Sequence, residues 1–399
     1  MLNKKTVEDI DVNGKKVLVR CDFNVPLDSK DPNVITSDKR IIASLQTIRY
    51  LMEHNAKVIL CSHLGKTGQD KSLAPVAKRL SEVLGKEVPL VHNILSNETK
   101  ELVNNMKPQD VILLENTRMY KEEEANNLDF AQALASLAEI FVNDAFGTAH
   151  RAHASTEGVT HFLPSVCGFL IEKELQELGK CIDHPKRPMV AVVGGSKVSS
   201  KIDMLESFLD RVDTLLVGGG MVFTFYQALG YPIGNSLLEE DKIEVAKEIL
   251  EKAEKSQANM LLPIDIVAAS AYAEDADVVT VEKDQIPEGY MGLDIGPKTT
   301  EEYASIISKA GTVVWNGPMG VFEMDRYAVG TNAIAKAMAE CEGVTIVGGG
   351  DSASAAKKSG YADRMTHIST GGGASLKLME GKKLVAIEAL DDKDEVEEK

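Results

Sequence analysis

The chain has 399 residues, of which 44% are hydrophobic, and its 44 Lys and Arg against 61 Asp and Glu give a net charge of −17. This length suits two domains better than one core, and the negative charge argues against general nucleic-acid or anionic-membrane binding. An anionic substrate would therefore need a locally basic cleft. Five scattered cysteines, none spaced Cys-x-x-Cys, argue against a disulfide framework or a cysteine zinc site. Because the sequence has no apolar N-terminal region and no run of about 18 apolar residues, we expect a cytoplasmic protein with no membrane or nucleic-acid partner.

Short β-branched runs alternate with helical patterns through the first half of the chain. The predicted strands are 17–19, 58–60, 111–114 and 140–142, and helical patterns cover 41–54, 73–84 and 127–138. Alternating strands and helices predict a parallel, doubly wound sheet. The strands are continuous apolar runs, as expected when helices cover both faces of a sheet.

The second half repeats this scheme with stronger signals. Its predicted strands are 190–193, 214–217, 260–262 with 264–267, 312–315, 344–347 and 365–368. Nearly all end in Gly, Asp or Asn. Ligands of open α/β sheets bind beyond the carboxyl ends of the strands, so the candidate chemistry lies there.

A helical stretch at 169–182, followed by Pro185 and Pro188, separates the halves. Prolines end a helix and open a linker. The predicted fold class is α/β, with two doubly wound, mostly parallel-sheet lobes joined by a helix and hinge. The predicted divisions are an N-terminal lobe at 1–168, a helix and linker at 169–187, and a C-terminal lobe at 188–375. The alternative is a surface loop within one large sheet.

Two glycine turns, each between a strand and a helix, mark the most informative region. Gly348–Ser352 follows one strand and 370–374 follows the next. Glycine lets backbone N–H groups approach an anion, and the following helix N-terminus adds partial positive charge. Asp351 within the first turn would repel a bare phosphate, which predicts a metal–phosphate site with a second phosphoryl cradle nearby.

Further glycine-rich strand ends support a phosphate ligand. Lys197 and Lys201 follow Gly194-Gly195, and on a helix this spacing puts both ammonium groups on one face, where a phosphate chain would relieve their repulsion. The alternative is a pair of solvated surface lysines. Gly218–Gly220 offers a flat surface for a ring, Asn316 could reach a phosphate, and Glu323 could bind ribose hydroxyls.

Two common nucleotide motifs do not fit. The P-loop pattern ending at Gly65-Lys66-Thr67 lacks its first glycine, because Leu60 stands there. Gly348-x-Gly350-x-x-Ala353 matches a dinucleotide fingerprint, but the next strand ends without the acidic residue that would bind a ribose. NAD binding is therefore the weaker alternative.

In the first half of the chain, basic residues gather at the ends of the predicted strands. Arg20, Asp22 and Asn24 alternate onto one face if the chain stays extended. The basic residues at or just past strand ends are Arg20, Arg40, His63, Lys66, Arg118, His150 and Arg151. This cluster suits a small, multiply anionic substrate, since arginine binds phosphate or carboxylate bidentately. His63 is alternatively a structural core histidine, and His150 with His153 is alternatively a helical metal pair.

Taken together, these motifs resemble those of the phosphoglycerate kinase family, of the bacterial type, along essentially the whole chain. The stretches that carry the resemblance are RCDFNVP (20–26), SHLGK (62–66), LLENTRMY (113–120), NDAFGTAHRAHAS (143–155), GGSKVSSKI (194–202), MGLDIGPKT (291–299), WNGPMGVFE (315–323), GGGDS (348–352) and STGGGAS (369–375). The resemblance implies reversible phosphoryl transfer between 1,3-bisphosphoglycerate and Mg-ADP, giving 3-phosphoglycerate and Mg-ATP. It also implies a monomer, and a C-terminal segment, 376–399, that returns to the N-terminal lobe.

The resemblance further implies a role for each matching residue. Asp22 and Asn24 hold the hydroxyl and carboxylate end of the glycerate, Arg40 clamps the carboxylate and the transferring group, and the non-transferred phosphate is held by His63, Lys66, Arg118 and Arg151. Phe23, Leu64 and Gly65 complete this substrate set. Lys197 and the amides of Gly371, Gly372 and Gly373 steady the transferred phosphoryl group. The nucleotide set is Lys201, Asn316, Glu323, Gly349, Gly350, Asp351, Ser352 and Ala353, with Asp351 on Mg²⁺ and with Gly219, Gly292 and Leu293 lining the adenine slot.

One position departs from the family pattern, which often has arginine where this chain has Lys66. Lysine keeps the charge but loses the bidentate fork. A general base is not required, because the acyl-phosphate oxygen leaves and returns as a carboxylate. The rival interpretation from another class is a two-lobed, non-catalytic ligand-binding protein, which ligand binding without turnover would support.

Overall fold

The computed structural model describes residues 3–66 and 68–393, apart from the side chains of residues 180–183. Thr67, the side chain of Cys181 and residues 394–399 of the predicted C-terminal segment lie outside the described residues. The chain divides into two compact units, unit 1 with residues 3–176 and 383–393 and unit 2 with Glu177–Lys382. The divisions fall within a helix and between Lys382 and Lys383, whereas the sequence analysis expected them at 168/169 and 375/376.

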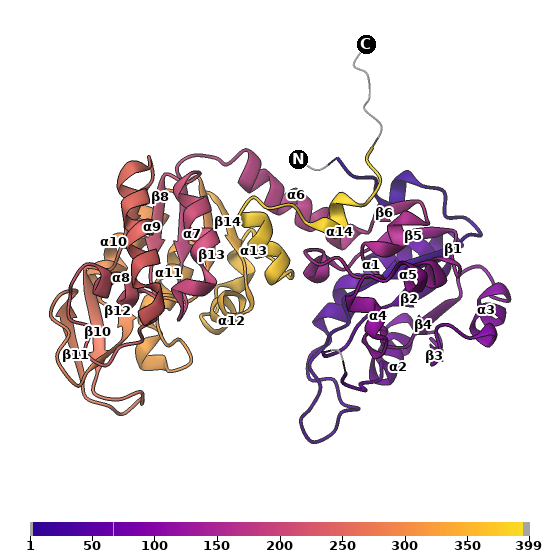
Figure 1. Ribbon diagram of the computed structural model, residues 1–399, viewed down its shortest axis with the longest axis horizontal. Helices are drawn as coiled ribbons and strands as arrows, with labels where there is room; N and C mark the ends of the chain where they lie inside the picture. The colour runs from indigo at the N-terminus through magenta and orange to yellow at the C-terminus, as the bar shows by residue number, and fades with distance from the viewer. Residues whose placement is uncertain (1–2, 67, 394–399) are drawn as a thin grey trace, which may run out of the picture. The chain divides into compact units, whose positions relative to one another are not determined.

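Unit 1 is built on a parallel sheet whose strands, over the described residues, lie in the order β3-β4-β2-β1-β5-β6 (Figure 1). The strands are β1 (Lys16–Arg20), β2 (Lys57–Cys61), β3 (Leu90–Val91), β4 (Val111–Leu114), β5 (Ile140–Asn143) and β6 (Ser165–Cys167). Its helices are α1 (Lys39–Glu53), α2 (Ala74–Leu84), α3 (Asn97–Asn104), α4 (Lys121–Glu124), α5 (Leu128–Ala135) and α14 (Val385–Glu388). β3 and β6 were missed from the sequence because runs of two and three residues carry no periodic signal.

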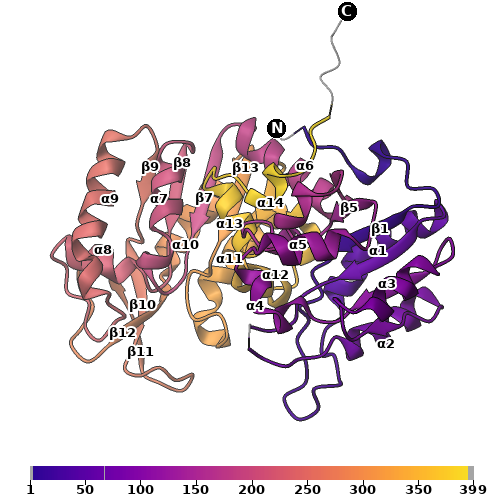
Figure 2. The same ribbon diagram turned by 45° about the vertical axis from the view of Figure 1, so that its right-hand side comes forward.

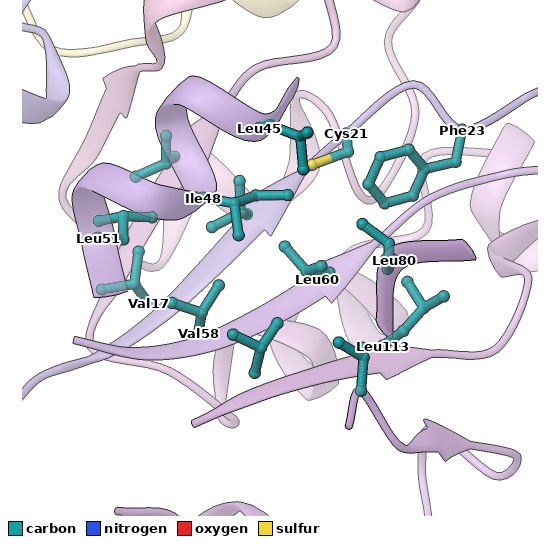
Figure 3. Close-up of a cluster of buried hydrophobic side chains, with 14 of the residues drawn as sticks. Val17, Cys21, Phe23, Leu45, Ile48, Leu51, Val58, Leu60, Leu80 and Leu113 are labelled. Atoms are coloured by element: carbon teal, nitrogen blue, oxygen red, sulfur yellow. The ribbon is translucent and has the colours of Figure 1, made fainter. Parts of the chain in front are cut away.

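The core of unit 1 lies between the sheet and the helices that cover it. Val17, Val58 and Leu113 come from three neighbouring strands and belong to one cluster with Leu45 and Ile48 of α1 (Figure 3), and all five side chains are buried. The helix boundaries follow from local chemistry. Pro stands in the first turn of α2, whose C-cap Gly85 has φ +63°, and the Ser96 hydroxyl caps α3 by accepting from Thr99 N.

Unit 2 has a parallel sheet with strand order β15-β14-β13-β7-β8-β9 across its described residues. The strands are β7 (Met189–Val193), β8 (Thr214–Val217), β9 (Asn259–Leu261), β13 (Thr312–Asn316), β14 (Val344–Val347) and β15 (His367–Ile368). Its helices are α7 (Ile202–Leu209), α8 (Val222–Ala228), α9 (Ile243–Lys255), α10 (Pro297–Ile307), α11 (Val329–Glu340), α12 (Gly350–Lys358) and α13 (Gly373–Met379), several of which flank the sheet in Figure 2. The predicted α/β class with two mostly parallel sheets is confirmed.

Unit 2 also contains a small antiparallel sheet that the sequence analysis did not predict. Its described strands, in the order β11-β10-β12, are β10 (Asp265–Ala269), β11 (Val278–Glu282) and β12 (Met291–Ile295). The prediction that grouped 260–262 with 264–267 was wrong, because β9 belongs to the parallel sheet and β10 to this one. Residues 262–264, which include Pro263, separate the two strands, and Ile264 N donates to Thr299 Oγ1 at 2.9 Å.

The long helix α6 (Phe169–Asp183) contains the division between the units. Its N-terminus is capped by Asp144, whose Oδ1 accepts from Leu170 N at 2.9 Å, while Phe169 N donates to Thr47 Oγ1 at 3.0 Å. Burial raises the pKa of Asp144 to about 7. Within the described ranges, no helix is both long and apolar enough to cross a membrane.

The two ends of the described chain are joined within unit 1. The buried Lys4 ammonium donates to the carbonyl oxygens of Glu388 at 2.9 Å and Leu390 at 2.7 Å. Asp391 N donates to the carbonyl oxygen of Ser165, the first residue of β6, at 2.8 Å, and Ala386 N donates to Ala149 O at 3.0 Å. Within the predicted C-terminal segment, Val385–Glu388 form the short helix α14.

Candidate functional site

Polar side chains of unit 1 gather beyond the carboxyl ends of the strands around β1. β1 pairs with β2 on one side and β5 on the other, so the strand order reverses at this point. Ligands in open α/β sheets bind at such a switch point. The predicted substrate residues near these strands lie at 22–24 after β1, 63–66 after β2, Arg118 after β4 and Arg151 after β5.

Asp22 and Arg40 form the first pair in this group. Arg40 stands in the first turn of α1, and its Nη1 donates to Asp22 Oδ1 at 2.8 Å. The Asp22 side chain is 11% exposed and that of Arg40 is 40% exposed. The pair therefore places a half-exposed cation beside a nearly buried carboxylate.

A second group connects the loops after β1, β2 and β4. Gly65 N donates to Asn24 Oδ1 at 2.9 Å, and Arg118 Nη1 donates to Gly65 O at 2.8 Å. Arg118 is 5% exposed, its Nε lies 3.2 Å from Glu124 Oε1, and its Nη2 has no hydrogen-bond partner among the described residues. Burial lowers the pKa of Arg118. A buried guanidinium with an N–H group left over is suited to bind an anion.

His63 lies at the end of β2, buried and next to cations. Arg20 Nη2 lies 3.1 Å from His63 Nδ1, and the carbonyl and amide of the following Leu64 are both held by Asn116. Burial, Arg20, Arg118 and Arg40 lower the pKa of His63 well below 6.5. His63 is therefore a neutral imidazole at neutral pH.

The other predicted substrate residues differ in exposure. Arg151 is exposed and its Nε donates to His150 Nε2 at 3.1 Å, whereas burial, Arg118 and Arg20 lower the pKa of His153 to about 4. Phe23 and Leu64 are 0% and 2% exposed and belong to the hydrophobic core of unit 1. These two residues can therefore contact a ligand only through their backbone.

In unit 2 the strand order reverses at β7, which pairs with β13 on one side and β8 on the other. The glycine loops after these strands are joined at Asn316, which is 2% exposed. Its Nδ2 donates to Gly348 O at 2.6 Å, and its Oδ1 accepts from Lys201 Nζ. Gly317 N donates to Ser352 Oγ at 2.6 Å, so Ser352 fixes the start of α12 against the loop after β13.

The two lysines after β7 do not share a helix face, so that prediction was wrong. Lys197 is exposed and precedes the 3₁₀ turn Val198–Ser200, and Lys201 follows this turn as the N-cap of α7. In a 3₁₀ turn, side chains three residues apart lie on the same face, and side chains four residues apart, such as those of Lys197 and Lys201, do not. Burial lowers the pKa of Lys201, while the nearby Asp351 and Glu380 raise it.

A cavity of about 430 Å³ lies beside these loops in unit 2. Its lining includes the predicted residues Gly219, Gly292, Leu293, Glu323 and Asp351 together with the apolar side chains of Phe223, Leu237, Ile266, Tyr272, Met291 and Val321. A Cβ on Gly292 would lie 2.1 Å from Phe223 Cζ, and one on Gly219, whose φ is +73°, would lie 2.5 Å from Gly195 N. Glycine is therefore required at both positions for the close packing of the cavity wall, and the apolar lining of the cavity suits a planar ring.

Asp351 is an exposed carboxylate in the first turn of α12, and Gly349, with φ +93°, caps this helix. Gly350 is the first residue of α12, and Ala353 N donates to Gly349 O at 3.1 Å. Over residues 3–66 and 68–393, no three His, Cys, Asp or Glu side chains gather to hold a metal ion. A single carboxylate fits Mg²⁺ carried by phosphates, because Mg²⁺ takes one or two protein carboxylates and fills its other positions with water and phosphate oxygens.

The second glycine turn precedes α13. Gly372 has φ +48° and is the N-cap of this helix, Gly373 is its first residue, and Gly371 N donates to Ser369 Oγ at 3.1 Å. In the part of unit 2 that the structure describes, the cavity lining does not include Lys197, Gly372 or Gly373. The structure therefore brings together the predicted ring-binding residues and leaves the predicted phosphoryl-binding groups on separate loops.

Two sets of residues near the sites were missed from the sequence. Leu237 and Tyr272 are both 60% exposed and line the cavity, but single apolar residues in loops carry no sequence signal. Glu123 and Ser155 are fully buried polar residues beside Arg20, and only the folded chain brings them together.

The comparisons with known proteins agree with this architecture. The family model described as phosphoglycerate kinase matches residues 7–382. Phosphoglycerate kinases of Clostridium tetani and of Clostridium botulinum strain Hall are 59% and 58% identical over 398 residues, which is 98% of this chain and 98% and 99% of theirs. The structure of phosphoglycerate kinase from Coxiella burnetii matches with a TM-score of 0.89 and 41% identity, covering 97% of this chain and 98% of that chain. That from Pyrococcus horikoshii OT3 matches with a TM-score of 0.82 and 32% identity over 97% and 98% of the two chains.

The fold and these relatives define a phosphotransferase that uses a carboxyl group as acceptor. The chain belongs to the phosphoglycerate kinase family. Its reaction is the reversible transfer of a phosphoryl group between 1,3-bisphosphoglycerate and ADP, giving 3-phosphoglycerate and ATP, in glycolysis and gluconeogenesis. The resemblance identified from the motifs is confirmed.

Proposed function

We propose that the two substrates bind to different units, the glycerate phosphate to the basic cluster of unit 1 and the magnesium nucleotide to the cavity of unit 2. The observation that carries this proposal is the contrast between the two sites. Arginine and histidine side chains converge in unit 1, whereas glycines and apolar side chains line the cavity of unit 2 beside the carboxylates of Glu323 and Asp351. A small polyanion suits the first environment and a planar base suits the second.

In unit 1, Asp22 and Asn24 orient the hydroxyl and carboxylate end of the glycerate. His63, Lys66, Arg118 and Arg151 bind the phosphate that is not transferred, and the backbone of 23 and 64–65 shapes the pocket. The leftover N–H of Arg118 supports this assignment, since a buried donor without a partner favours a ligand that supplies an acceptor. Arg40 binds the carboxylate and stabilises charge on the group in transfer.

In unit 2, Gly219, Gly292 and Leu293 bind the adenine and Glu323 the ribose. Lys201 and Asn316 bind nucleotide phosphates, together with the start of α12 at 349–353, whose N-terminal N–H groups favour anions. Lys197 and the amides of Gly372 and Gly373 bind the transferring phosphoryl group. Asp351 would hold Mg²⁺, which, when bound, offsets the negative charge of the nucleotide phosphates.

No side chain has to remove a proton in this reaction, because the acceptor is already a carboxylate oxygen. The residues of this chain therefore act by positioning both substrates and by neutralising charge. Arg40 does both, since it is anchored through Asp22 and is still 40% exposed to a ligand.

The test is steady-state phosphorylation of 3-phosphoglycerate by Mg-ATP, with the product consumed in a coupled reduction and with an EDTA control. Arg118→Gln is expected to raise KM for 3-phosphoglycerate about tenfold or more and leave KM for ATP unchanged. Asp351→Asn is expected to raise the magnesium concentration needed for half-maximal rate, with KM for 3-phosphoglycerate unchanged. Exposed Arg49→Gln, on α1, is the matched control.

The opposite pattern, in which Arg118→Gln changes only KM for ATP, would reverse the assignment of the units. Binding of both ligands without turnover would favour the alternative of a non-catalytic binding protein. We also propose that the protein acts as a monomer in the cytoplasm, which sedimentation and cell fractionation would test.

A further inference from the structure

A chain of buried polar side chains runs behind His63 in unit 1. Arg20, the last residue of β1, donates from Nε to Ser155 Oγ at 2.8 Å. Ser155 Oγ donates in turn to Glu123 Oε1 at 2.5 Å, and Ser155 N donates to Glu123 Oε2 at 3.0 Å. Arg20, Ser155 and Glu123 are all 0% exposed and His63 is 3% exposed.

The chemistry of the Arg20 guanidinium determines which atom is the donor in its contact with His63. Arginine has five N–H donors and no acceptor. The 3.1 Å contact between Arg20 Nη2 and His63 Nδ1 is therefore a hydrogen bond only if Nδ1 accepts. An imidazole that accepts at Nδ1 carries its proton on Nε2 when neutral. The remaining Arg20 contact goes from Nη1 to Cys21 O, so backbone and side-chain acceptors fix the guanidinium on several sides.

The surroundings of His63 keep its imidazole neutral. The positively charged groups near the ring are Arg20, Arg118 and Arg40, and His153 also lies within range. Together with burial they lower the pKa of His63 well below 6.5. A neutral histidine can bind an anion only through an N–H group, so the position of its single proton matters.

We propose that Arg20 is a positioning residue which fixes the Nε2–H tautomer of His63 and so aims an N–H donor at the phosphate of the glycerate substrate. Glu123 and Ser155 hold Arg20 in place and balance its buried charge. This inference rests on the proposed role of His63 in binding that phosphate. It gives Arg20 a different function from Arg40 and Arg118, because Arg20 acts through the histidine and does not contact the substrate.

The tautomer can be measured directly in the wild-type protein. Long-range ¹H–¹⁵N correlation spectra of ¹⁵N-histidine-labelled protein distinguish a protonated from an unprotonated ring nitrogen, and a His63→Gln variant identifies the His63 signals. We expect protonated Nε2 and unprotonated Nδ1 across neutral pH. A protonated Nδ1 would overturn the proposal, and this measurement needs no variant with a modified buried network.

The kinetic test removes the Arg20 contact without leaving a buried charge unpaired. Arg20→Met is combined with Glu123→Gln, so that both buried charges are removed together, and the wild type is the reference. We expect the double variant to populate both His63 tautomers and to raise KM for 3-phosphoglycerate about tenfold, with kcat and KM for ATP unchanged. Arg79→Met, on α2 and bonded to Asp38 and Glu82, is the matched control for losing one arginine from unit 1.

Removing Arg20 in a His63→Gln variant distinguishes a positioning role of Arg20 from direct binding of the substrate. Gln at position 63 places its amide N–H near the location of Nε2–H and has no tautomers. In the His63→Gln background the loss of Arg20 should therefore change KM by less than about twofold. The same tenfold increase in that background would show that Arg20 binds the substrate itself and would overturn the proposal.

Failure of the proposed function gives a different result. If His63→Ala leaves KM for 3-phosphoglycerate unchanged, His63 does not bind the phosphate, and the aiming role of Arg20 is overturned with it. If His63→Ala raises KM but the loss of Arg20 changes neither the tautomer nor KM, the substrate role stands and the positioning role is overturned.

Discussion

Arg40 Nη1 and Asp22 Oδ1 lie 2.8 Å apart, and this contact joins the first turn of α1 to the loop after β1. Asp22 Oδ1 also accepts from Asn24 N at 3.3 Å, so one carboxylate oxygen organises both the loop and the arginine. Arg40 is anchored by one of its donors, and its other N–H groups are available to a ligand.

Arg40→Ala is expected to lower kcat by a factor of at least about 100, with the affinity for Mg-ATP unchanged, because the arginine stabilises charge that develops during transfer. Steady-state rates and calorimetric nucleotide titration measure the two quantities. Arg49→Ala on the same helix is the control, since Arg49 is exposed and bonds to Val83 O. A loss confined to KM for 3-phosphoglycerate would contradict this role.

Lys66→Arg is expected to lower KM for 3-phosphoglycerate about threefold. Lys66 is exposed, so arginine can be accommodated, and its planar fork binds a phosphate with two N–H groups where lysine offers a point charge. Substrate saturation curves at fixed Mg-ATP measure the change. An unchanged KM would mean that position 66 does not contact the phosphate.

Gly292→Ala is expected to weaken nucleotide binding and to destabilise unit 2. The added Cβ would overlap the Phe223 ring, which is 3% exposed and lines the cavity, so the ring would have to shift into the space proposed for the adenine. Overpacking of this kind costs about 1–3 kcal/mol in the free energy of unfolding. KM for ATP and denaturant unfolding measure the two effects.

Gly179→Ala in α6 is the matched control, because its Cβ would meet nothing within 4 Å. In a helix interior that change should add about 0.5–1 kcal/mol of stability. Equal effects of the two substitutions would show that the space beside Phe223 is not what requires glycine at position 292.

Asp294→Asn tests the pH dependence of stability. Asp294 Oδ2 accepts from Gly330 N at 2.8 Å in the first turn of α11, and burial raises the pKa of this carboxyl to about 7. In the unfolded chain an aspartate has a pKa of about 3.9, so between about pH 4 and pH 7 the unfolded state loses a proton that the folded state keeps. The stabilisation from this group is therefore present below pH 4 and is lost as the pH rises to 7, by up to about 1.4 kcal/mol per pH unit.

The asparagine variant keeps an oxygen acceptor and has no proton to lose. Its stability relative to the wild type should therefore rise between pH 4 and pH 7 and stay constant above pH 7. Urea unfolding of both proteins across this range measures the difference. A difference independent of pH would show that Asp294 is ionised in the folded protein.

The sequence alone was sufficient to predict the features of the fold that depend on local residue patterns. Apolar runs such as 111–114 and 214–217 predicted strands with the observed bounds, and glycines at strand ends marked the loops near the sites. Features that depend on tertiary pairing were not accessible. β10 has the composition of a parallel-sheet strand, but it pairs with β11 and β12 in a separate antiparallel sheet.

The same limit applies to the sites. The motif around Arg20 marked it as one cation in a basic cluster, yet its contacts with Ser155 and His63 come from residues 135 and 43 positions away. Lys197 and Lys201 have helical spacing, but the intervening 3₁₀ turn separates them. Residue type and spacing therefore identified candidate site residues. The directions in which their side chains point could be known only from the folded structure.

Unit 1 is interrupted in the sequence, because all of unit 2 is inserted between residue 176 and residue 383. Leu384, Ile387 and Leu390 are buried, and Asp391 N donates to the carbonyl oxygen of Ser165, the first residue of β6. During synthesis on a ribosome the second unit is thus complete while the first still lacks these side chains. A nascent chain that lacks these side chains exposes the apolar surface that they cover, so unit 1 completes its core only after residues 384–391 have been synthesised.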